Sequence, residues 1–414
     1  MSLTVLDLFC GAGGASLGFA KAGYEVVGAV DANETAIDIY RQNLCEGDLV
    51  DAYPGKVPFD KPLQADLSRE YEDDAIDDNL PTVTFEDIRD HFDLAPGEVN
   101  IICGCPPCQN FSSLRDTEPW PDNKPKDSLL RAFIEFIEEE VPDVVFFENV
   151  QNIMTAGDDV PTTYVDWLER SMERITRNGD SCAERGYGHA LDVRNAADYG
   201  VPQRRNRAIG VFVYGQDDDD VSLPEPTHAE NSAGGEDREE WVTVNEAFSQ
   251  AESLFQDLEA GEKQVGIDGY PDDSSHRARN HQSRTIERMK AIRKHGDSWR
   301  DLKGTEDEEY IVDAHRDLET GADAAYGIMD GDQPAPTLTT KCTMPSSGRF
   351  THPTKNRAIT FREAALLMTF PRWFELPSTN DHAETLVGNA VPPDFVSSIA
   401  DHISMCVKTP VTAN

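Results

Sequence analysis

Short apolar runs alternate with turns and amphipathic segments along the first half of the chain. Residues 4–9 form one such run, a glycine turn follows, and residues 15–22 have the spacing of an amphipathic helix before a second apolar run at 25–30. Apolar runs of this length between helical segments are typical of parallel strands joined by helices. The same pattern recurs at residues 99–102, 144–147, 188–193 and 208–214. We therefore predict an α/β fold with a Rossmann-like, mostly parallel sheet.

The charge balance changes which partners can be considered. The chain of 414 residues carries 77 acidic and 37 basic side chains, a formal net charge of -40. Such an excess normally argues against a nucleic-acid partner, because phosphates attract Lys and Arg. Widespread disorder is a second interpretation, but 38% hydrophobic residues are too many for it. We favour a third, a halophilic protein, because the Debye length falls to about 3 Å at 1 M salt and surface repulsion is then weak. On that interpretation the charge does not exclude DNA.

Targeting and redox signals are absent from the sequence. No early apolar segment resembles a signal peptide, and no apolar run is long enough to span a membrane. Most of the 8 cysteines are scattered singly and do not suggest a disulfide framework. We therefore expect a cytoplasmic protein with no membrane partner.

The glycine turn after the first strand predicts a nucleotide-type site. Gly11 and Gly13 lie between a strand and a helix, and Asp31 ends the second strand about 20 residues later. An acidic residue at that position binds a ribose diol in nucleotide-binding sheets. Ser16 stands where the dinucleotide fingerprint has glycine, which disfavours a pyrophosphate or nicotinamide ligand. The alternatives are a tight turn without a ligand and, for Asp31, a helix N-cap.

A long polar insertion separates this unit from the next strand. Residues 46–86 are rich in Asp, Pro and Gly and read as a surface insertion. Asp87, just after it, either binds the base amine of a cofactor or caps the following helix. The insertion also makes Asp66 an alternative to Asp87.

Three cysteines within six positions follow that strand, at 103, 105 and 108. Glycine and two prolines force the chain out of the sheet there, where open α/β sheets place their chemistry. Cys108 is our candidate nucleophile, because a thiol is already partly nucleophilic near neutral pH. We expect Cys103 and Cys105 to be structural. A zinc half-site is the alternative, but no second close cysteine pair is present.

Charged residues follow two later strands. Glu148 directly follows the apolar run 144–147, so it lies at the same sheet edge as the cysteine loop. Buried there, it would have a raised pKa and could donate a proton to a substrate ring; helix capping is the alternative. Arg205 and Arg207 would point to one side of an extended segment, which suits a phosphate or an electron-rich ring edge unless they form a surface ion pair.

A basic stretch appears in the second half. Residues 276–300 hold eight Lys or Arg against two acidic residues. A basic face in so acidic a chain suggests a polyanion partner, with an ordinary solvated helix as the alternative.

Taken in order, these motifs resemble those of the cytosine-C5 DNA methyltransferase family. The resemblance covers most of residues 1–215 and 336–407, and it rests on six motifs: residues 7–14, 107–109, 148–150, 203–207, 362–364 and 388–392. It implies a class I methyltransferase fold, S-adenosyl-L-methionine as cofactor and no metal. It implies domains at 1–215 (catalytic), 216–340 (a smaller, mixed target-recognition domain), 341–375 (hinge and return) and 376–414 (a segment completing the catalytic domain).

The resemblance also implies a role for each motif residue. Cys108 would attack C6 of a cytosine flipped out of double-stranded DNA, Glu148 would hold N3, and Arg205 would support the substrate ring while Arg207 orients the loop. The remaining expectations are cofactor contacts from Phe9, Gly11, Gly13, Asp31, Asp87 and Asn389, and DNA contacts from Gln109, Ser112, Gln203, Arg277, Arg279 and Arg284. Asp87 is preferred to Asp66 because it keeps the short spacing to the cysteine loop that the family shows. We expect a monomer in a restriction-modification or orphan methylation system, the former with a cognate restriction endonuclease. The rivals are the tRNA-methylating branch of the family and a catalytically inactive DNA-binding relative.

Overall fold

The computed structural model describes residues 2–46, 53–68, 80–107, 128–155, 163–177, 186–230, 238–249, 258–264 and 274–406. The chain divides into two compact units. Unit 1 comprises residues 1–196, 206–226 and 391–414, and unit 2 comprises residues 197–205 and 227–390. Residues 197–205 and 341–390 therefore belong to unit 2, whereas the expected boundaries placed them in the catalytic, hinge and C-terminal segments.

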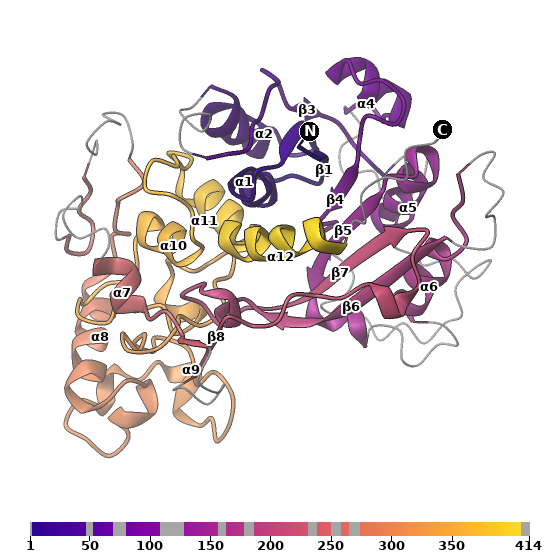
Figure 1. Ribbon diagram of the computed structural model, residues 1–414. Coiled ribbons are helices and arrows are strands. Elements are labelled where there is room, and N and C mark those ends of the chain that lie inside the picture. The colour runs from indigo at the N-terminus through magenta and orange to yellow at the C-terminus, as the bar shows by residue number, and fades with distance from the viewer. Residues whose placement is uncertain are drawn as a thin grey trace. The chain divides into compact units, whose positions relative to one another are not determined.

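Unit 1 is built on a seven-stranded sheet with the strand order β3-β2-β1-β4-β5-β7-β6 (Figure 1). The five strands from β3 to β5 are parallel, and β7 pairs antiparallel with both β5 and β6. This arrangement confirms the mostly parallel sheet predicted from the apolar runs. The strands are β1 (Thr4–Leu8), β2 (Glu25–Asp31), β3 (Leu63–Gln64), β4 (Ile101–Gly104), β5 (Val144–Val150), β6 (Tyr187–Asn195) and β7 (Asn206–Tyr214).

A large apolar core lies between the sheet and helices of unit 1. Phe133, Phe136 and Ile137, spaced along one face of α5, are fully buried against strand residues such as Phe147. Burying a side chain of this size contributes roughly 1.5–3 kcal/mol. The helices of unit 1 are α1 (Gly14–Lys21), α2 (Glu34–Tyr40), α4 (Phe85–Phe92), α5 (Ser128–Glu140), α6 (Tyr164–Met172) and α12 (Pro393–Cys406).

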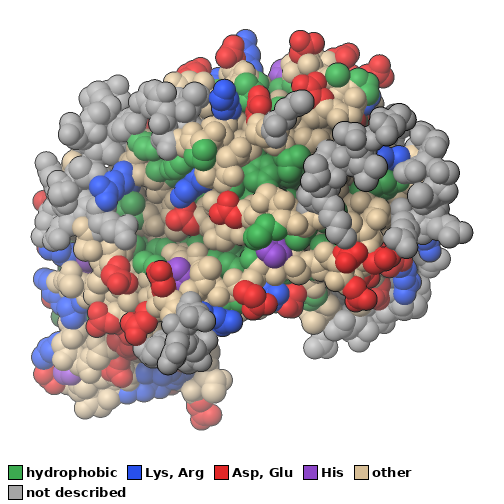
Figure 2. Space-filling view, viewed as in Figure 1, with side chains coloured by type: hydrophobic (Ala, Val, Ile, Leu, Met, Phe, Trp, Pro, Cys, Tyr) green, Lys and Arg blue, Asp and Glu red, His purple; other side chains and the backbone are tan. Residues whose placement is uncertain are grey.

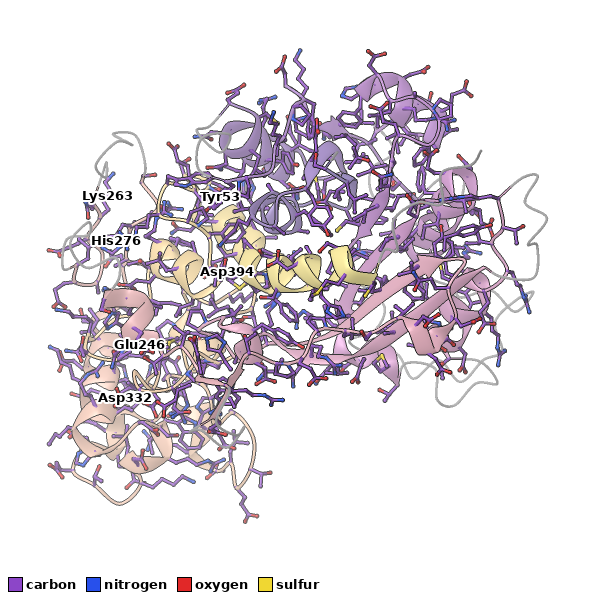
Figure 3. The ribbon with its side chains drawn as sticks, in the orientation of Figure 1. Tyr53, Glu246, Lys263, His276, Asp332 and Asp394 are labelled. Carbon is purple, nitrogen blue, oxygen red and sulfur yellow. The ribbon has the colours of Figure 1, made fainter. Side chains whose placement is uncertain are left out.

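The last helix of the chain packs directly on the first. A side chain at Gly18 of α1 would approach Val396 of α12 to 2.5 Å, so only glycine permits this contact. Lys21, at the end of α1, pairs with Asp394 and lies 5.7 Å from the ring centre of Tyr53; Asp394 and Tyr53 are both labelled in Figure 3. The C-terminal helix therefore belongs to the layer that supports the glycine turn at the start of α1.

Unit 2 is smaller and mixed in structure. Its core gathers around Trp299, Ile292 and Leu302, and the Trp299 indole donates to the carbonyl of Ala322 at 2.8 Å. None of the helices among the described residues of the chain is long and apolar enough to cross a membrane. The elements of unit 2 are strands β8 (His228–Ala229) and β9 (Glu239–Glu240), which pair in parallel, and helices α7 (Val244–Ser249), α8 (Ser283–His295), α9 (Asp313–Arg316), α10 (Phe361–Leu367) and α11 (Asn380–Asn389).

Candidate active site

The glycine turn and the end of β2 form one connected site in unit 1. The backbone N–H of Gly11 donates to one oxygen of Asp31 at 2.9 Å, and the N–H of Asn33 donates to the other at 2.8 Å. Asn33 itself caps α2, so Asp31 is not the N-cap. Burial raises the pKa of Asp31, although these backbone hydrogen bonds act in the opposite direction. Each carboxylate oxygen keeps acceptor capacity, which suits the hydroxyls of a ribose diol.

The backbone of the turn is shaped for close approach by a ligand. Gly11 has a φ of 53°, and a side chain there would meet nothing within 4 Å, so the space beside its backbone is open to a ligand. Gly13, with a φ of 90°, is instead required by internal packing, because a side chain there would meet Leu44 at 2.1 Å. Phe9 is held at a φ of 61°, a conformation that side-chain-bearing residues rarely adopt and that clusters at ligand sites. The predicted cofactor residues Phe9, Gly11, Gly13 and Asp31 are thus neighbours along one sheet edge, and they fit a nucleoside-type cofactor.

Asp7 is a buried residue of this site that the sequence analysis did not single out. One oxygen of its carboxylate accepts from both the backbone N–H and the hydroxyl of Ser16, at 3.1 and 2.5 Å, and Tyr40 donates to that hydroxyl at 2.9 Å. Burial raises the pKa of Asp7 to about 7. The network ties β1 to the first turn of α1. A single acidic residue inside an otherwise apolar strand was the signal that could have revealed it.

Asp87 does not lie where the sequence analysis expected. Its exposed side chain accepts from the backbone and hydroxyl of Thr84, the N-cap of α4, in a capping box, and these bonds lower its pKa. Asp66 is the better candidate, because β3 pairs beside Asp31 and Asp66 follows it, buried, two residues later. The capping alternative therefore describes Asp87, and the choice between Asp66 and Asp87 as the cofactor residue stays a prediction.

Two of the three clustered cysteines are unsuited to nucleophilic attack. Burial raises the pKa of Cys103 well above its usual range. A hydrogen bond with Cys103 lowers the pKa of Cys105, but burial and the nearby carboxylates of Glu148 and Asp7 outweigh it and raise that pKa to about 11. Both are protonated near neutral pH, as expected for structural thiols. Cys108, Gln109 and Ser112 lie outside the described residues.

Glu148 and Arg207 form an ion pair at the carboxyl end of β5. Arg207 Nε lies 3.0 Å from Glu148 Oε1, and both side chains are largely buried. The antiparallel pairing of β5 with β7 sets this geometry, because it places Val150 opposite Arg207. Next to Glu148, the Asn149 amide donates to the carbonyl of Pro106 at 3.0 Å and so fixes the start of the cysteine loop. Glu148 is buried, as expected.

Arg205 is an anchor within unit 2 and does not present its guanidinium to a substrate ring. It is 1% exposed, and its two terminal nitrogens donate to the carbonyls of Leu338, Gly388 and Ala390 at 2.9–3.2 Å. Gln203 is equally buried, accepting from the N–H of Leu338 and donating to the carbonyl of Leu367. The roles expected for Arg205 and Gln203 therefore need correction. Alternation along an extended segment did not reveal that the two arginines belong to different units. The chain passes from unit 2 into unit 1 between residues 205 and 206, so Arg205 and Arg207 have different neighbours.

The basic stretch is also used mainly inside unit 2. Arg277 donates to the carbonyls of Ser274, Pro377 and Thr379, and it stacks over the ring of Phe361 at 4.3 Å. Arg279 pairs with Glu384 at 2.6 Å. Arg284 is exposed and donates to the carbonyl of Glu309 at 3.1 Å. Arg277 and Arg279 are therefore engaged with backbone and carboxylate oxygens of their own unit, and their DNA contacts stay a prediction.

Asn389 ends α11 in unit 2 with an exposed side chain, and its cofactor role stays a prediction.

Comparison with known proteins shows which family the chain is similar to. The model of the family described as C-5 cytosine-specific DNA methylase matches residues 3–60 and 66–405.

Relatives of known name match nearly the whole chain. The type II methyltransferase M1.HphI of Haemophilus parahaemolyticus is 28% identical over 403 residues, covering 97% of this chain and 87% of that protein. The type II methylase M.HgiDII of Herpetosiphon aurantiacus is 28% identical over 411 residues, covering 96% and 94%. Among solved structures, the S. pombe Dnmt2 methyltransferase has the same fold, with a TM-score of 0.55, 16% identity and 98% of each chain covered.

Proposed function

We infer that this chain, which belongs to the C-5 cytosine-specific DNA methylase family, transfers a methyl group from S-adenosyl-L-methionine to C5 of cytosine in DNA. The single observation that carries the assignment is the family match over nearly the whole length. The site residues given below are proposals, supported by the ion pair of Glu148 with Arg207 and by the cradle around Asp31.

We propose that Cys108 is the nucleophile. Cytosine C5 is weakly nucleophilic because the ring is aromatic and nearly neutral. Addition of the Cys108 thiolate to C6 forms a carbon–sulfur bond and moves electron density to C5, while Glu148 holds N3 and delivers a proton there. After C5 has gained the methyl group, the C5 proton passes to water, the electrons of that C–H bond restore the C5–C6 double bond and expel the Cys108 thiolate, and N3 returns its proton to Glu148. The high pKa values of Cys103 and Cys105 support Cys108 as the reactive thiol.

Arg207 is proposed to orient the Glu148 carboxylate through the 3.0 Å ion pair. Asn149 fixes the backbone just before the nucleophile through its bond to the Pro106 carbonyl. The two side chains would thereby hold the carboxylate and the start of the cysteine loop in place for a base swung out of the duplex. This reassigns the substrate-side role from Arg205 to Arg207.

The cofactor is proposed to lie along the carboxyl ends of β1, β2 and β3. Asp31 would accept the two ribose hydroxyls, and the turn at Gly11 and Gly13 would let the ligand approach the backbone. Asp66 replaces Asp87 as the candidate for the base amine, and Asn389 stays a candidate from unit 2. When bound, S-adenosyl-L-methionine supplies an electrophilic methyl group on a sulfonium.

Double-stranded DNA is the proposed substrate, and a monomer the proposed active form. The two relatives named above carry the type II name, so we propose a restriction-modification context with a cognate endonuclease of the same sequence specificity. Co-purification or genetic linkage with such a nuclease is the direct check.

Bisulfite sequencing of duplex DNA incubated with the protein and S-adenosyl-L-methionine tests the function. Methylated cytosines should appear within one short sequence, and a Cys108→Ala variant should methylate none while still binding DNA. A duplex carrying 5-fluorocytosine at that position should form a covalent adduct, since fluorine cannot leave as a proton. Methylation by the alanine variant, or intact protein mass after the fluorinated duplex, would contradict the mechanism.

A further inference from the structure

Part of the predicted surface insertion, residues 53–68, is built into unit 1. The N–H of Gly55 donates to the carbonyl of Ala20, near the end of α1, at 2.9 Å. A side chain at Gly55 would meet the carbonyl oxygen of Tyr24 at 2.3 Å, so the segment lies directly against the backbone there. Val57 is buried as well. This part of the insertion is therefore a layer of unit 1 that packs on the helix following the glycine turn.

Phe59, in the same segment, packs on Tyr40, the last residue of α2. The two rings are stacked, with their centroids 6.1 Å apart and their planes at 22°. Phe92 of α4 meets the Phe59 ring edge-on at 5.1 Å. Aromatic pairs in these geometries attract one another beyond the burial of their area. The insertion thereby holds the ring of Tyr40, which is 0% exposed.

Tyr40 in turn packs against the glycine turn. A side chain at Gly13 would meet the Tyr40 ring at 2.9 Å and Leu44 at 2.1 Å. Leu44 belongs to a π-helical turn, Arg41–Cys45, and such turns are frequent at functional sites. Tyr40 and Leu44 therefore support the backbone at Gly13 from inside the protein, while the space beside Gly11 is open.

The hydroxyl of Tyr40 also begins a chain of hydrogen bonds. It donates to the Ser16 hydroxyl at 2.9 Å, and that hydroxyl donates to Asp7 at 2.5 Å. Burial raises the pKa of Tyr40 well above its usual range, so the hydroxyl keeps its proton and stays a donor. Hydrogen bonds in such a chain strengthen one another. Because Asp7 lies in β1 and Ser16 in α1, the chain ties together the two elements on either side of the glycine turn.

We propose that Tyr40 is a positioning residue for the cofactor, and that Phe59 of the insertion holds Tyr40 in place. The inference rests on the proposed function, which supplies S-adenosyl-L-methionine as the ligand of the glycine turn. A glycine-rich turn has many accessible conformations, so fixing its backbone beforehand favours binding. Tyr40 fixes it twice, through its ring at Gly13 and through its hydroxyl at Ser16. Since Tyr40 is fully buried, it acts on the cofactor through the turn.

Calorimetric titration of the full-length protein with S-adenosyl-L-methionine tests the hydroxyl. Tyr40→Phe keeps the ring and loses the hydroxyl, so Kd should rise roughly fivefold. Tyr24→Phe is the matched control, because the buried Tyr24 hydroxyl donates to the carbonyl of Ala400 in α12 at 2.7 Å. Both variants should lower the melting temperature similarly, but the control should leave Kd unchanged. An unchanged Kd for Tyr40→Phe, or an equal rise in both variants, would overturn the role of Tyr40.

Two variants of Phe59 test the insertion. Phe59→Ala removes the stacked ring and should raise Kd for the cofactor roughly threefold or more, whereas Phe59→Tyr keeps the ring and should bind as wild type does. In methyl-transfer assays, Phe59→Ala and Tyr40→Phe should raise KM for the cofactor and keep kcat within about twofold of wild type. An unchanged Kd for Phe59→Ala would overturn the role of the insertion, and a loss of kcat at unchanged KM would overturn positioning.

Cofactor binding is measured without DNA, so this proposal and the proposed function can fail separately. Wild-type protein that binds S-adenosyl-L-methionine but methylates no cytosine would overturn the proposed function alone, because the Kd values of Tyr40→Phe and Tyr24→Phe would still decide the role of Tyr40. Wild-type protein that does not bind S-adenosyl-L-methionine would overturn both.

Discussion

At the scale of single residues, Asp66 and Asp87 show how position along the sheet outweighs distance along the chain. Asp66 is buried just after the strand that pairs with Asp31, whereas the side chain of Asp87 bonds within the capping box of α4. The Asp87 side chain is exposed and bonded within its own helix cap, so we do not expect it to contact a cofactor at the edge of the sheet.

We therefore predict that Asp66→Ala weakens S-adenosyl-L-methionine binding at least about tenfold, through loss of a buried acceptor. Asp87→Ala should leave cofactor affinity unchanged and lower the melting temperature slightly, through loss of the cap. Calorimetric titration of both variants with the cofactor is the measurement. Equal affinities for Asp66→Ala and wild type would return the base contact to another residue.

The buried carboxyl group of Asp7 leads to a prediction of how the stability of the protein depends on pH. Burial raises its pKa to about 7 from an ordinary 3.8, so between those values the folded protein holds a proton that the unfolded chain releases. Raising the pH from about 4 to about 7 should therefore decrease the free energy of unfolding through Asp7, by up to roughly 4 kcal/mol, with no further change above that interval.

Asp7→Asn replaces the acid by an amide that does not titrate, so stability should fall less steeply between pH 5 and 7 than in wild type. Thermal unfolding at constant ionic strength measures this, with Asp219→Asn, an exposed site, as the control. Parallel pH profiles for wild type and Asp7→Asn would show that the buried carboxyl does not govern stability.

At the scale of elements, the segment 203–207 serves two parts of the molecule. Its first half belongs to unit 2, where Arg205 binds three carbonyls, and its second half begins β7 of unit 1, where Arg207 pairs with Glu148. One motif therefore joins a buried anchor of unit 2 to a residue that we propose for the active site.

Replacing Arg205 and replacing Arg207 should therefore have different effects on stability and turnover. Arg205→Ala leaves buried carbonyls unsatisfied, so we expect a loss of about 3 kcal/mol or more in unfolding free energy. Arg207→Ala should reduce turnover roughly 10²-fold with a smaller effect on melting temperature. Single-turnover rates and thermal unfolding of both variants are the measurements. The reverse pattern would restore the original assignment of Arg205 to the substrate.

At the scale of the whole molecule, the net charge of -40 is the dominant property. Acidic side chains are spread over the face in Figure 2, which suits a surface whose self-repulsion is screened by salt.

We predict that the melting temperature rises as KCl is increased from about 0.1 M to about 3 M, because the Debye length contracts from about 10 Å to below 3 Å and surface repulsion falls. Differential scanning calorimetry at several KCl concentrations is the measurement. A melting temperature that is constant or falls with salt would remove the halophilic interpretation while leaving the enzymatic assignment untouched.

The sequence alone determined the parallel sheet, its order of strands and helices, and the glycine turn with Asp31, because apolar periodicity and backbone conformation are local properties. It also identified Glu148 at a strand end. The tertiary structure decided the rest. Whether an arginine faces substrate or backbone carbonyls depends on which distant segments pack around it, as Arg205 and Arg279 show. Asp66 and Asp87 differ for the same reason: both are acidic residues near a strand, and only the pairing of β3 beside β2 separates a buried carboxylate from a helix cap.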